Sequence, residues 1–413
     1  MEFLAGDALN GRGSGTRDEW IAASYVASQM RRLGLEPLGD DGGYVQKVTT
    51  ERAELTSAPV LTIGGRRFTH GKEIYANPGA ARVVGRLETW APGAVIQPGA
   101  AVLLPDPAPE DFTPPQGALV LSPRPSIIKE RWSTFLARPA RVAPRLLKTQ
   151  HSPPSVVFLD PDAYAVAASA ARGDTITLQA EAKPAVPSYT WNAVGRLRGE
   201  PGKGVILLSA HIDHLGNRTD PPGGSGDQIF NGADDDASGA VAVLELMEAL
   251  THGSRPKHTI VFALFGSEET GGTGSRFFAE KPVVPLTDIL ANLQFEMLGR
   301  PDGKLPPQTL WLTGYERSTL GPELARRGAR LVQDPHPEQK FFERSDNFEF
   351  ARRGVVAHTV SSYGLHADYH TPADEIGGID FAHMTTAIRS MLEPVRSLAN
   401  SEFVPQWLPG KKP

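Results

Sequence analysis

Residues 205–214 read Val205-Ile206-Leu207-Leu208-Ser209-Ala210-His211-Ile212-Asp213-His214, an apolar run that leads directly into polar residues. A short uninterrupted apolar run is typical of a strand that is buried on both faces of a sheet. In an open sheet flanked by helices, ligands bind beyond the carboxyl ends of the strands. The polar end of this segment is therefore the first place to look for a functional site.

Two later segments repeat the pattern. The apolar run 259–265 ends in Gly266-Ser267-Glu268-Glu269, and the run 289–295 is followed by Glu296. An apolar helix is predicted over 238–250, a further strand over 355–360, and a closing helix over 380–398. The alternation of strands and helices predicts an α/β fold, with a mixed central sheet flanked by helices.

The first 187 residues contain two regions that differ in composition and in predicted secondary structure. A helix is predicted over 16–33, with Thr16 and Glu19 as a capping box and Gly34 at its end. The glycine-rich stretch Gly11-Arg12-Gly13-Ser14-Gly15 before it follows no strand and is interpreted as a plain turn. From Pro59 onward, short β-prone pieces such as 60–63 and 101–104 are broken by many prolines. We therefore expect a catalytic domain made of residues 1–58 and 188–413, and an inserted β-rich domain or lid at 59–187.

The composition excludes several classes of function. The net charge of -5 and the pI near 6.1 give no reason to expect nucleic acid or an anionic membrane as a partner. The chain has no cysteine, so thiol catalysis and cysteine-bound zinc are excluded, and a metal would be held by His and carboxylates. No apolar run reaches the length of a membrane span, and the first residues lack the pattern of a signal peptide. The expectation is a cytoplasmic protein or a chain that begins after a removed leader.

Two more segments carry potential ligands. One is Asn231-Gly232-Ala233-Asp234-Asp235-Asp236-Ala237-Ser238-Gly239, and the other is Asp368-Tyr369-His370-Thr371-Pro372. Each polar group has an ordinary alternative explanation when taken alone, such as helix capping for the three aspartates. Together, two His and three carboxylates suit a pair of Zn²⁺ ions, with Mn²⁺ or Co²⁺ as substitutes.

The series of motifs resembles that of the M28 family of metallopeptidases. The resemblance rests on the stretches around His211, Asp235, Glu269, Glu296 and His370, and it covers the N-terminal helix region and most of residues 189–400. It implies a zinc-exopeptidase-like fold.

Site roles follow from this resemblance residue by residue. It implies that Asp235 bridges two zinc ions, that His211 and Glu296 complete one of them, and that Glu269 and His370 complete the other. Glu268 is expected to be the general base that activates a metal-bridging water, and Asp213 the carboxylate that orients His211. The peptide bond between Asp235 and Asp236 is expected to be cis, as in relatives.

The chain also departs from the family pattern. Glu296 stands where many relatives have Asp, Asn347 replaces a His, and Phe342 falls where some members have a tyrosine that supports the tetrahedral intermediate. Oxyanion stabilisation or substrate binding is therefore expected from Asn347, Tyr363 or His366. His214, next to the first ligand, is expected to line the cleft.

The function predicted from this resemblance is that of an aminopeptidase that releases N-terminal residues from peptides. A carboxypeptidase or dipeptidase on the same scaffold, or a non-catalytic peptide-binding relative, are the alternatives. A single-zinc glutaminyl cyclase is disfavoured because ligands for two ions are present. Relatives with this layout are usually exported, so a secreted or periplasmic location is expected, with a cytoplasmic one as the alternative.

Overall fold

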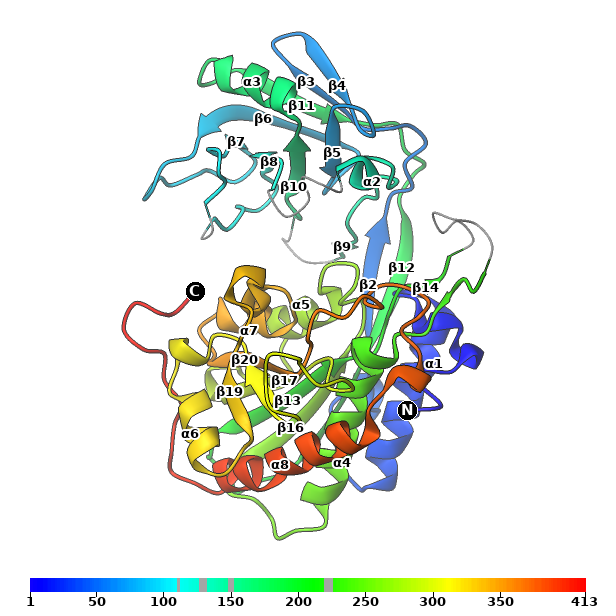
Figure 1. Cartoon of the computed structure of the whole chain (residues 1–413), viewed down its shortest axis with the longest axis vertical. Helices are drawn as coiled ribbons and strands as arrows, with labels where there is room; N and C mark the ends of the chain where they lie inside the picture. The colour runs from blue at the N-terminus through cyan, green and yellow to red at the C-terminus, as the bar shows by residue number, and fades with distance from the viewer. Residues whose placement is uncertain (110–111, 126–131, 148–151, 219–225) are drawn as a thin grey trace. The chain divides into compact units, whose positions relative to one another are not determined.

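The computed structural model describes residues 1–109, 112–125, 132–147, 152–218 and 226–413. The chain forms two compact units, which are drawn in Figure 1. Unit 1 contains Met1–Val48 and Tyr189–Pro413, and unit 2 contains Thr49–Ser188. The chain leaves unit 1 within strand β2 (Val45–Arg52) and returns to it within β12 (Val186–Leu197). Unit 1 is therefore built from two separate stretches of sequence.

The sheet of unit 1 is mixed and has β13 (Val205–His211) near its middle. This strand runs parallel to both neighbours, β16 (Thr259–Phe265) and β17 (Ile289–Phe295). The strand order is β19-β18-β20-β17-β13-β16-β12-β2, and β12 and β18 run antiparallel to their partners β16 and β20. The other strands of this sheet are β18 (Leu310–Leu312), β19 (Leu331–Gln333), β20 (Ala357–Ser361) and β1 (Glu36–Pro37), which pairs with β12. Strands β14 (Gly216–Asn217) and β15 (Ile229–Phe230) form a separate two-stranded sheet. The predicted mixed sheet is confirmed.

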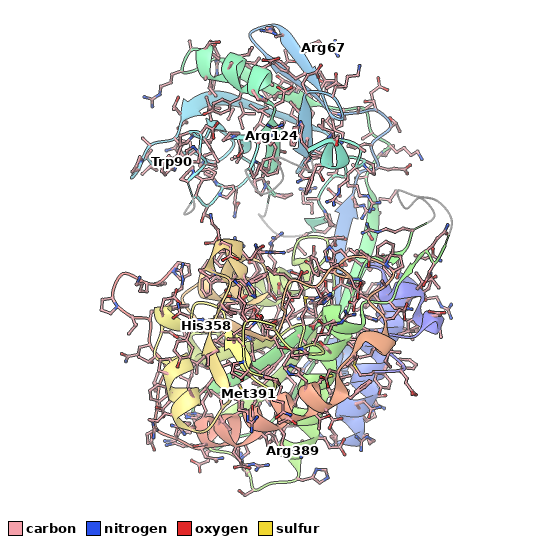
Figure 2. All side chains as sticks on the ribbon, in the orientation of Figure 1. Arg67, Trp90, Arg124, His358, Arg389 and Met391 are labelled. Carbon is pink, nitrogen blue, oxygen red and sulfur yellow. The ribbon has the colours of Figure 1, made fainter. Side chains whose placement is uncertain are left out.

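Helices cover both faces of this sheet because the strand side chains alternate between them. Ile206 and Leu208 belong to a core that includes residues of α1 (Arg17–Arg32), α4 (Gly239–Thr251), α6 (Leu320–Arg326) and α8 (Phe381–Ala399). Leu207 belongs to the opposite core, with Phe278 of α5 (Thr273–Glu280) and Phe350 of α7 (Asn347–Ala351). Figure 2 shows how densely side chains fill this unit, with His358 and Met391 labelled. The side chains on both faces of β13 are thus buried, as its unbroken apolar run predicted.

Helix α1 lies close to its predicted bounds, but its cap differs from the prediction. Thr16 Oγ1 accepts hydrogen bonds from the backbone N–H groups of Asp18 and Glu19. In a complete capping box, the Glu19 carboxylate would accept the N–H of Thr16. Instead it accepts the N–H of Gly15, and the N–H of Thr16 donates to the carbonyl of Gly13. The capping box is therefore only half formed, and the Glu19 carboxylate is engaged elsewhere.

Unit 2 is rich in short strands and has its own core. Its main sheet has the order β4-β3-β11-β6-β7-β8-β10-β5. Residues such as Leu61, Leu119 and Ile176 are fully buried in the hydrophobic core of unit 2. The elements are β3 (Val60–Ile63), β4 (Arg66–Thr69), β5 (Ile74–Asn77), β6 (Arg82–Thr89), β7 (Ala101–Leu103), β8 (Leu119–Pro123), α2 (Trp132–Leu136), β9 (Arg145–Leu146), β10 (Ser155–Leu159), α3 (Pro161–Ser169) and β11 (Thr175–Gln179). In the described ranges of the chain, no helix has the length and apolar character needed to cross a membrane.

Candidate metal centre

The first ligand candidates lie where β13 ends. His211 is the last residue of the strand, and Ile212 still donates its N–H to Phe265 of the neighbouring strand β16. His211, Asp213 and His214 are all fully buried. The carboxyl end of the central strand therefore delivers three polar side chains into the interior, as the sequence predicted for a sheet of this kind.

The three consecutive aspartates before α4 have different tasks. Asp234 accepts the N–H of Gly299, and Asp236 accepts the N–H groups of His211 and Met297. These two carboxylates thus fasten the loop to the ends of the neighbouring strands. The peptide bond between Asp235 and Asp236 is cis, as the family resemblance implied. The Asp235 side chain is left to face the histidines.

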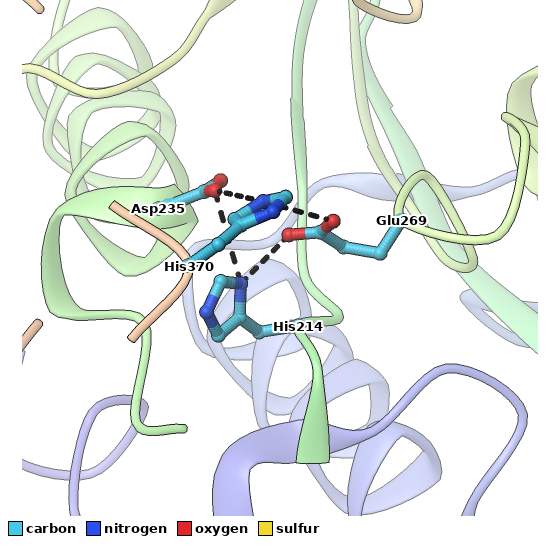
Figure 3. A group of neighbouring side chains, drawn as sticks. All are labelled: His214, Asp235, Glu269 and His370. Carbon is cyan, nitrogen blue, oxygen red and sulfur yellow. Dashed lines mark hydrogen bonds and ion pairs between the residues drawn. The ribbon is translucent and has the colours of Figure 1, made fainter. Parts of the chain in front are cut away.

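Two groups of potential ligand atoms meet at Asp235. His214, Asp235, Glu269 and His370 form one group, and His211, Asp235 and Glu296 form the other; within each, the donor atoms lie within 4.8 Å of one another. His211 Nε2 lies 3.1 Å from Asp235 Oδ1, while His370 Nε2 lies 3.1 Å from Asp235 Oδ2 and 3.2 Å from Glu269 Oε2. Figure 3 shows the first group, with the side chains of Asp235, Glu269, His214 and His370 pointing toward one another. The five residues predicted as ligands therefore converge, with Asp235 shared between both groups.

The donor set fits a pair of metal ions. His211 Nε2, His370 Nε2 and Glu296 Oε2 are buried atoms that form no hydrogen bond, although carboxylate oxygens lie close to both histidine nitrogens. Buried polar atoms are normally paired, so three unpaired atoms around one carboxylate call for another partner. Imidazole nitrogen and carboxylate oxygen are ligands that Zn²⁺ prefers.

The loop that carries Glu268 is held through its backbone. Asp213 Oδ1 accepts the N–H of Glu268 at 3.0 Å, and Asp213 Oδ2 accepts the N–H of Glu269 at 3.3 Å. Asp213 Oδ2 also accepts the hydroxyl of Ser14 at 2.5 Å. His211 Nδ1 lies 3.2 Å from the carbonyl oxygen of Asp213 and 3.6 Å from its carboxylate. Asp213 therefore contacts His211 mainly through its backbone. Its carboxylate holds the backbone of the loop of residues 267–269, which is called the glutamate loop below.

Opposite charges set the ionisation of the group around His370. Burial and the nearby Asp235 would raise the pKa of Glu269, but His370 and His214 outweigh them and hold that pKa at about 2. Burial would lower the pKa of His370, but Glu269 and Asp235 raise it to about 10. For Asp235, burial is outweighed by the close approach of His211 and His370, which holds its pKa well below the usual value. These side chains are charged together across the neutral pH range.

Burial acts in the opposite sense on the other two glutamates. It raises the pKa of Glu296 to about 7, with Asp235 adding to the effect and His211 opposing it. Burial also raises the pKa of Glu268 well above its usual value, with Glu296 contributing and His211 again opposing. A carboxyl group with a raised pKa exchanges protons more readily near neutral pH. Glu268 and Glu269 are adjacent in sequence but have different electrostatic surroundings.

His214 has a larger part in the site than the sequence indicated. Its Nδ1 lies 2.8 Å from Glu269 Oε1, and its ring lies edge-on to the His370 ring at a centroid distance of 5.6 Å. The sequence predicted only that His214 lines the cleft. Its contact with a candidate ligand was missed because two residues separate it from the end of β13, and only the fold shows which way the ring turns.

The three candidates for oxyanion or substrate binding lie in different surroundings. Asn347 is fully buried and uses its amide to donate to the Phe342 carbonyl and to accept the hydroxyl of Thr359, so its side chain is engaged within the core. His366 Nε2 lies 3.0 Å from Asp234 Oδ2. Tyr363 lines a small cavity of about 30 Å³ together with Glu296 and Tyr369. Tyr363 therefore shares a cavity with a candidate metal ligand.

Comparisons with known proteins agree with this arrangement. Residues 192–395 match the model of Peptidase family M28, a segment that contains all five candidate ligands. Residues 192–395 therefore form a segment of peptidase family M28.

The chain that contains this M28 segment is similar in fold to two solved bacterial enzymes. An aminopeptidase from Aneurinibacillus sp. strain AM-1 aligns with a TM-score of 0.56 and 18% identity, covering 98% of this chain and 93% of that one. BSAP, a zinc aminopeptidase from Bacillus subtilis, aligns with a TM-score of 0.53 and 18% identity, covering 97% and 94%. At such identities, the likeness shows the fold.

A curated relative is similar in sequence over part of its length. Leucine aminopeptidase 1 of Paracoccidioides brasiliensis is 26% identical over 245 residues, which cover 56% of this chain and 62% of that protein. The chain spans less than two thirds of the length of this relative and of other curated relatives that it matches.

Proposed function

We propose that the protein is a two-zinc metallo-aminopeptidase that releases the N-terminal residue of peptides. The observation that carries the proposal is the convergence of two donor groups on Asp235, with buried nitrogen and oxygen atoms left unpaired around it. His211, Asp235 and Glu296 would hold one ion, and Asp235, Glu269 and His370 the other. The M28 segment and the aminopeptidases among the similar proteins support the same conclusion.

The residues divide the chemistry between them. When bound, the two ions lower the pKa of water and polarise the scissile carbonyl of the substrate. Glu268 accepts the proton of the attacking water and returns it to the leaving amine. Its raised pKa suits this double role, because the protonated form must also be accessible. Asp213 fixes the backbone of Glu268 and Glu269, so the two neighbours keep separate tasks.

Glu268→Gln tests the role of the base. The substitution keeps the size of the side chain but cannot accept the proton, so we expect kcat to fall by about 10²- to 10⁴-fold. Metal analysis of the variant and of the wild type should both give two zinc ions per chain. Loss of metal from the variant, or turnover equal to that of the wild type, contradicts the assigned role.

A panel of dipeptides and amino-acid amides with free and blocked N-termini tests the direction of cleavage. We expect hydrolysis of the substrates with a free N-terminus and none of the blocked ones. Hydrolysis of N-blocked peptides with a free carboxyl terminus would instead assign a carboxypeptidase. Peptide binding without hydrolysis in the zinc-loaded protein would assign a binding function.

The location of the protein is part of the same proposal. Because relatives of this layout are usually exported, we place the activity in a secreted or periplasmic compartment. Fractionation of cells that express the full gene tests this, and activity confined to the cytoplasmic fraction would overturn it.

A further inference from the structure

Glu19 is a carboxylate on an outer helix whose side chain is nevertheless fully buried. It lies in the first turn of α1, and the sequence interpreted it as half of a capping box. Its Oε1 accepts the N–H of Ser267 at 2.7 Å and the hydroxyl of Thr190 at 2.7 Å. Its Oε2 accepts the N–H of Gly15 at 3.0 Å. Glu19 thus joins the start of α1 to the residue that precedes Glu268.

The backbone of the glutamate loop is held by hydrogen bonds to two buried carboxylates. The N–H groups of three consecutive residues, Ser267, Glu268 and Glu269, donate to Glu19 and Asp213. Ser267 has a φ of +55°, in the left-handed region that a residue with a side chain adopts rarely. Such a conformation persists where the surroundings hold it, and here the hydrogen bond from the N–H of Ser267 to Glu19 is one of the restraints.

The fit between Glu19 and the loop is tight. A Cβ atom added to Gly266 would lie 2.5 Å from Glu19 Oε1 and 2.4 Å from Thr190 Oγ1. The carboxylate therefore occupies the space directly beside the backbone that leads out of strand β16. A buried carboxylate is costly unless it is well paired, and Glu19 accepts hydrogen bonds from the loop, from Thr190 and from the turn before α1.

We propose that Glu19 is a positioning residue for Glu268, fixing the loop backbone so that the Glu268 carboxylate is presented correctly to the reacting water. The inference rests on the proposed function, because it assigns Glu268 the role of base. Small displacements of a reacting group are expensive: about 1 Å costs on the order of 10²-fold in rate. Ligand residues other than Glu269 lie on other loops, so the loss of Glu19 should affect the chemical step more than zinc binding.

Glu19→Ala and Glu19→Gln, assayed as zinc-loaded full-length protein, test the proposal. Alanine removes both acceptors, and we expect kcat to fall on the order of 10²-fold while KM stays within about twofold. Glutamine keeps an oxygen that can accept the N–H of Ser267, so it should recover part of the lost kcat. Zinc content should remain at the wild-type value in both variants.

Hydrogen exchange provides a readout that does not depend on turnover. In metal-free and zinc-loaded Glu19→Ala, the amides of residues 267–269 should exchange faster than in the wild type, with the strands β13 and β17 unchanged. Asp18→Asn is the matched control, because it removes a carboxylate from the same helix turn that does not reach the loop. It should leave kcat, KM and exchange as they are.

Several outcomes would overturn the inference. One is a kcat in both Glu19→Gln and Glu19→Ala equal to that of the wild type. Another is a raised KM with an unchanged kcat in these variants. A third is a loss of zinc from the variants in proportion to their loss of activity. If Glu19→Ala does not fold, Thr190→Val is compared with Glu19→Gln. Thr190→Val removes one hydrogen-bond donor to Glu19 and should lower kcat with an unchanged KM. An unchanged kcat in both variants would overturn the inference. If the wild-type protein shows no zinc-dependent peptide hydrolysis, it is the proposed function that fails, while faster exchange in the loop of Glu19→Ala would still support the structural link.

Discussion

Arg12 joins two loops that carry candidate ligands. Its guanidinium donates to the carbonyl of Ile212, next to His211, at 2.9 Å, and to the carbonyls of Asn231 and Gly232 at 2.7 and 3.0 Å. A fourth bond goes to the carbonyl of Leu4. The side chain is 1% exposed, so water contributes little to satisfying these groups. One cation thus binds the end of β13 to the segment that leads to Asp235.

Replacing Arg12 should destabilise unit 1. In Arg12→Met, four buried carbonyls lose their donor, and each unsatisfied group costs about 1–3 kcal/mol, less where water or relaxation compensates. We expect the free energy of unfolding to fall by about 3 kcal/mol or more, measured as a lower midpoint of urea denaturation. Arg17→Met, at an exposed position, should change the midpoint little. A midpoint for Arg12→Met equal to that of the wild type would contradict the role described here.

The sequence could identify the candidate ligands but not the residues that hold them. His211, Glu269 and Glu296 follow apolar runs that mark strand ends, and this signal is local. Arg12 stands in a glycine-rich stretch that resembles a plain turn, and Glu19 satisfies the sequence pattern of a capping box. Apart from Leu4 and Gly15, their partners lie 171 to 248 positions away along the chain. Such contacts leave no periodic or local trace in a single sequence.

At the scale of elements, α5 and α7 are joined by a buried ionic cluster around Glu349. Its carboxylate is paired with Arg276 of α5 and with Arg352 and Arg353 just beyond α7. Burial would raise the pKa of Glu349, but the three guanidinium groups lower it below its usual value of 4.5. The ionised carboxylate therefore contributes to stability above about pH 4.5, and this contribution is lost as the pH falls through the lower folded-state pKa.

Glu349→Gln should accordingly reduce stability in a pH-dependent way. At pH 7 we expect a loss of about 2 kcal/mol in the free energy of unfolding, because three cations lose their anionic partner in partly buried surroundings. The difference from the wild type should shrink as the pH falls through the folded-state pKa of Glu349, which lies below 4.5, because the wild-type carboxylate then also becomes neutral. Urea denaturation at pH 7 and at pH 3.5 measures it. A difference that grows on acidification would show that the sign assigned to Glu349 is wrong.

The elements themselves were largely predictable, and their exceptions have physical reasons. The strands 259–265 and 289–295 have the predicted bounds, because long apolar runs between polar residues define them clearly. The predicted strand 355–360 begins later, at Ala357, because Val355 follows a turn at Gly354 and donates its N–H back to the carbonyl of Phe350 in α7 rather than to a neighbouring strand. Apolarity alone does not distinguish these two roles.

At the scale of the whole molecule, the change of sequence texture near Pro59 and the structural division at Val48 do not coincide. Residues 49–52 continue strand β2, so neither proline nor glycine marks this first passage from unit 1 to unit 2. Amino-acid composition reflects the local sequence, whereas the boundary between the two structural units depends on which segments pack together.

Chelation should lower the thermal stability of the protein. A ligand present at about 1,000 times its dissociation constant stabilises the folded state by about 4 kcal/mol, which corresponds to roughly 10 °C in a unit of this size. We therefore expect EDTA to lower the calorimetric midpoint by roughly this amount, and added Zn²⁺, but not Mg²⁺, to restore it. An identical midpoint with and without EDTA would contradict the assignment of the donor groups to metal.

The separation between Glu19 and Ser267 also has a consequence for the order in which the nascent chain can fold. The two residues are 248 positions apart, so at about 5–20 residues per second the ribosome needs about 10 to 50 seconds to deliver the second after the first. Throughout that interval α1 has emerged without the strands against which it packs, whereas residues 49–188 are contiguous and complete earlier. The N-terminal helix must therefore be kept from aggregating or from degradation while its docking surface is still being translated.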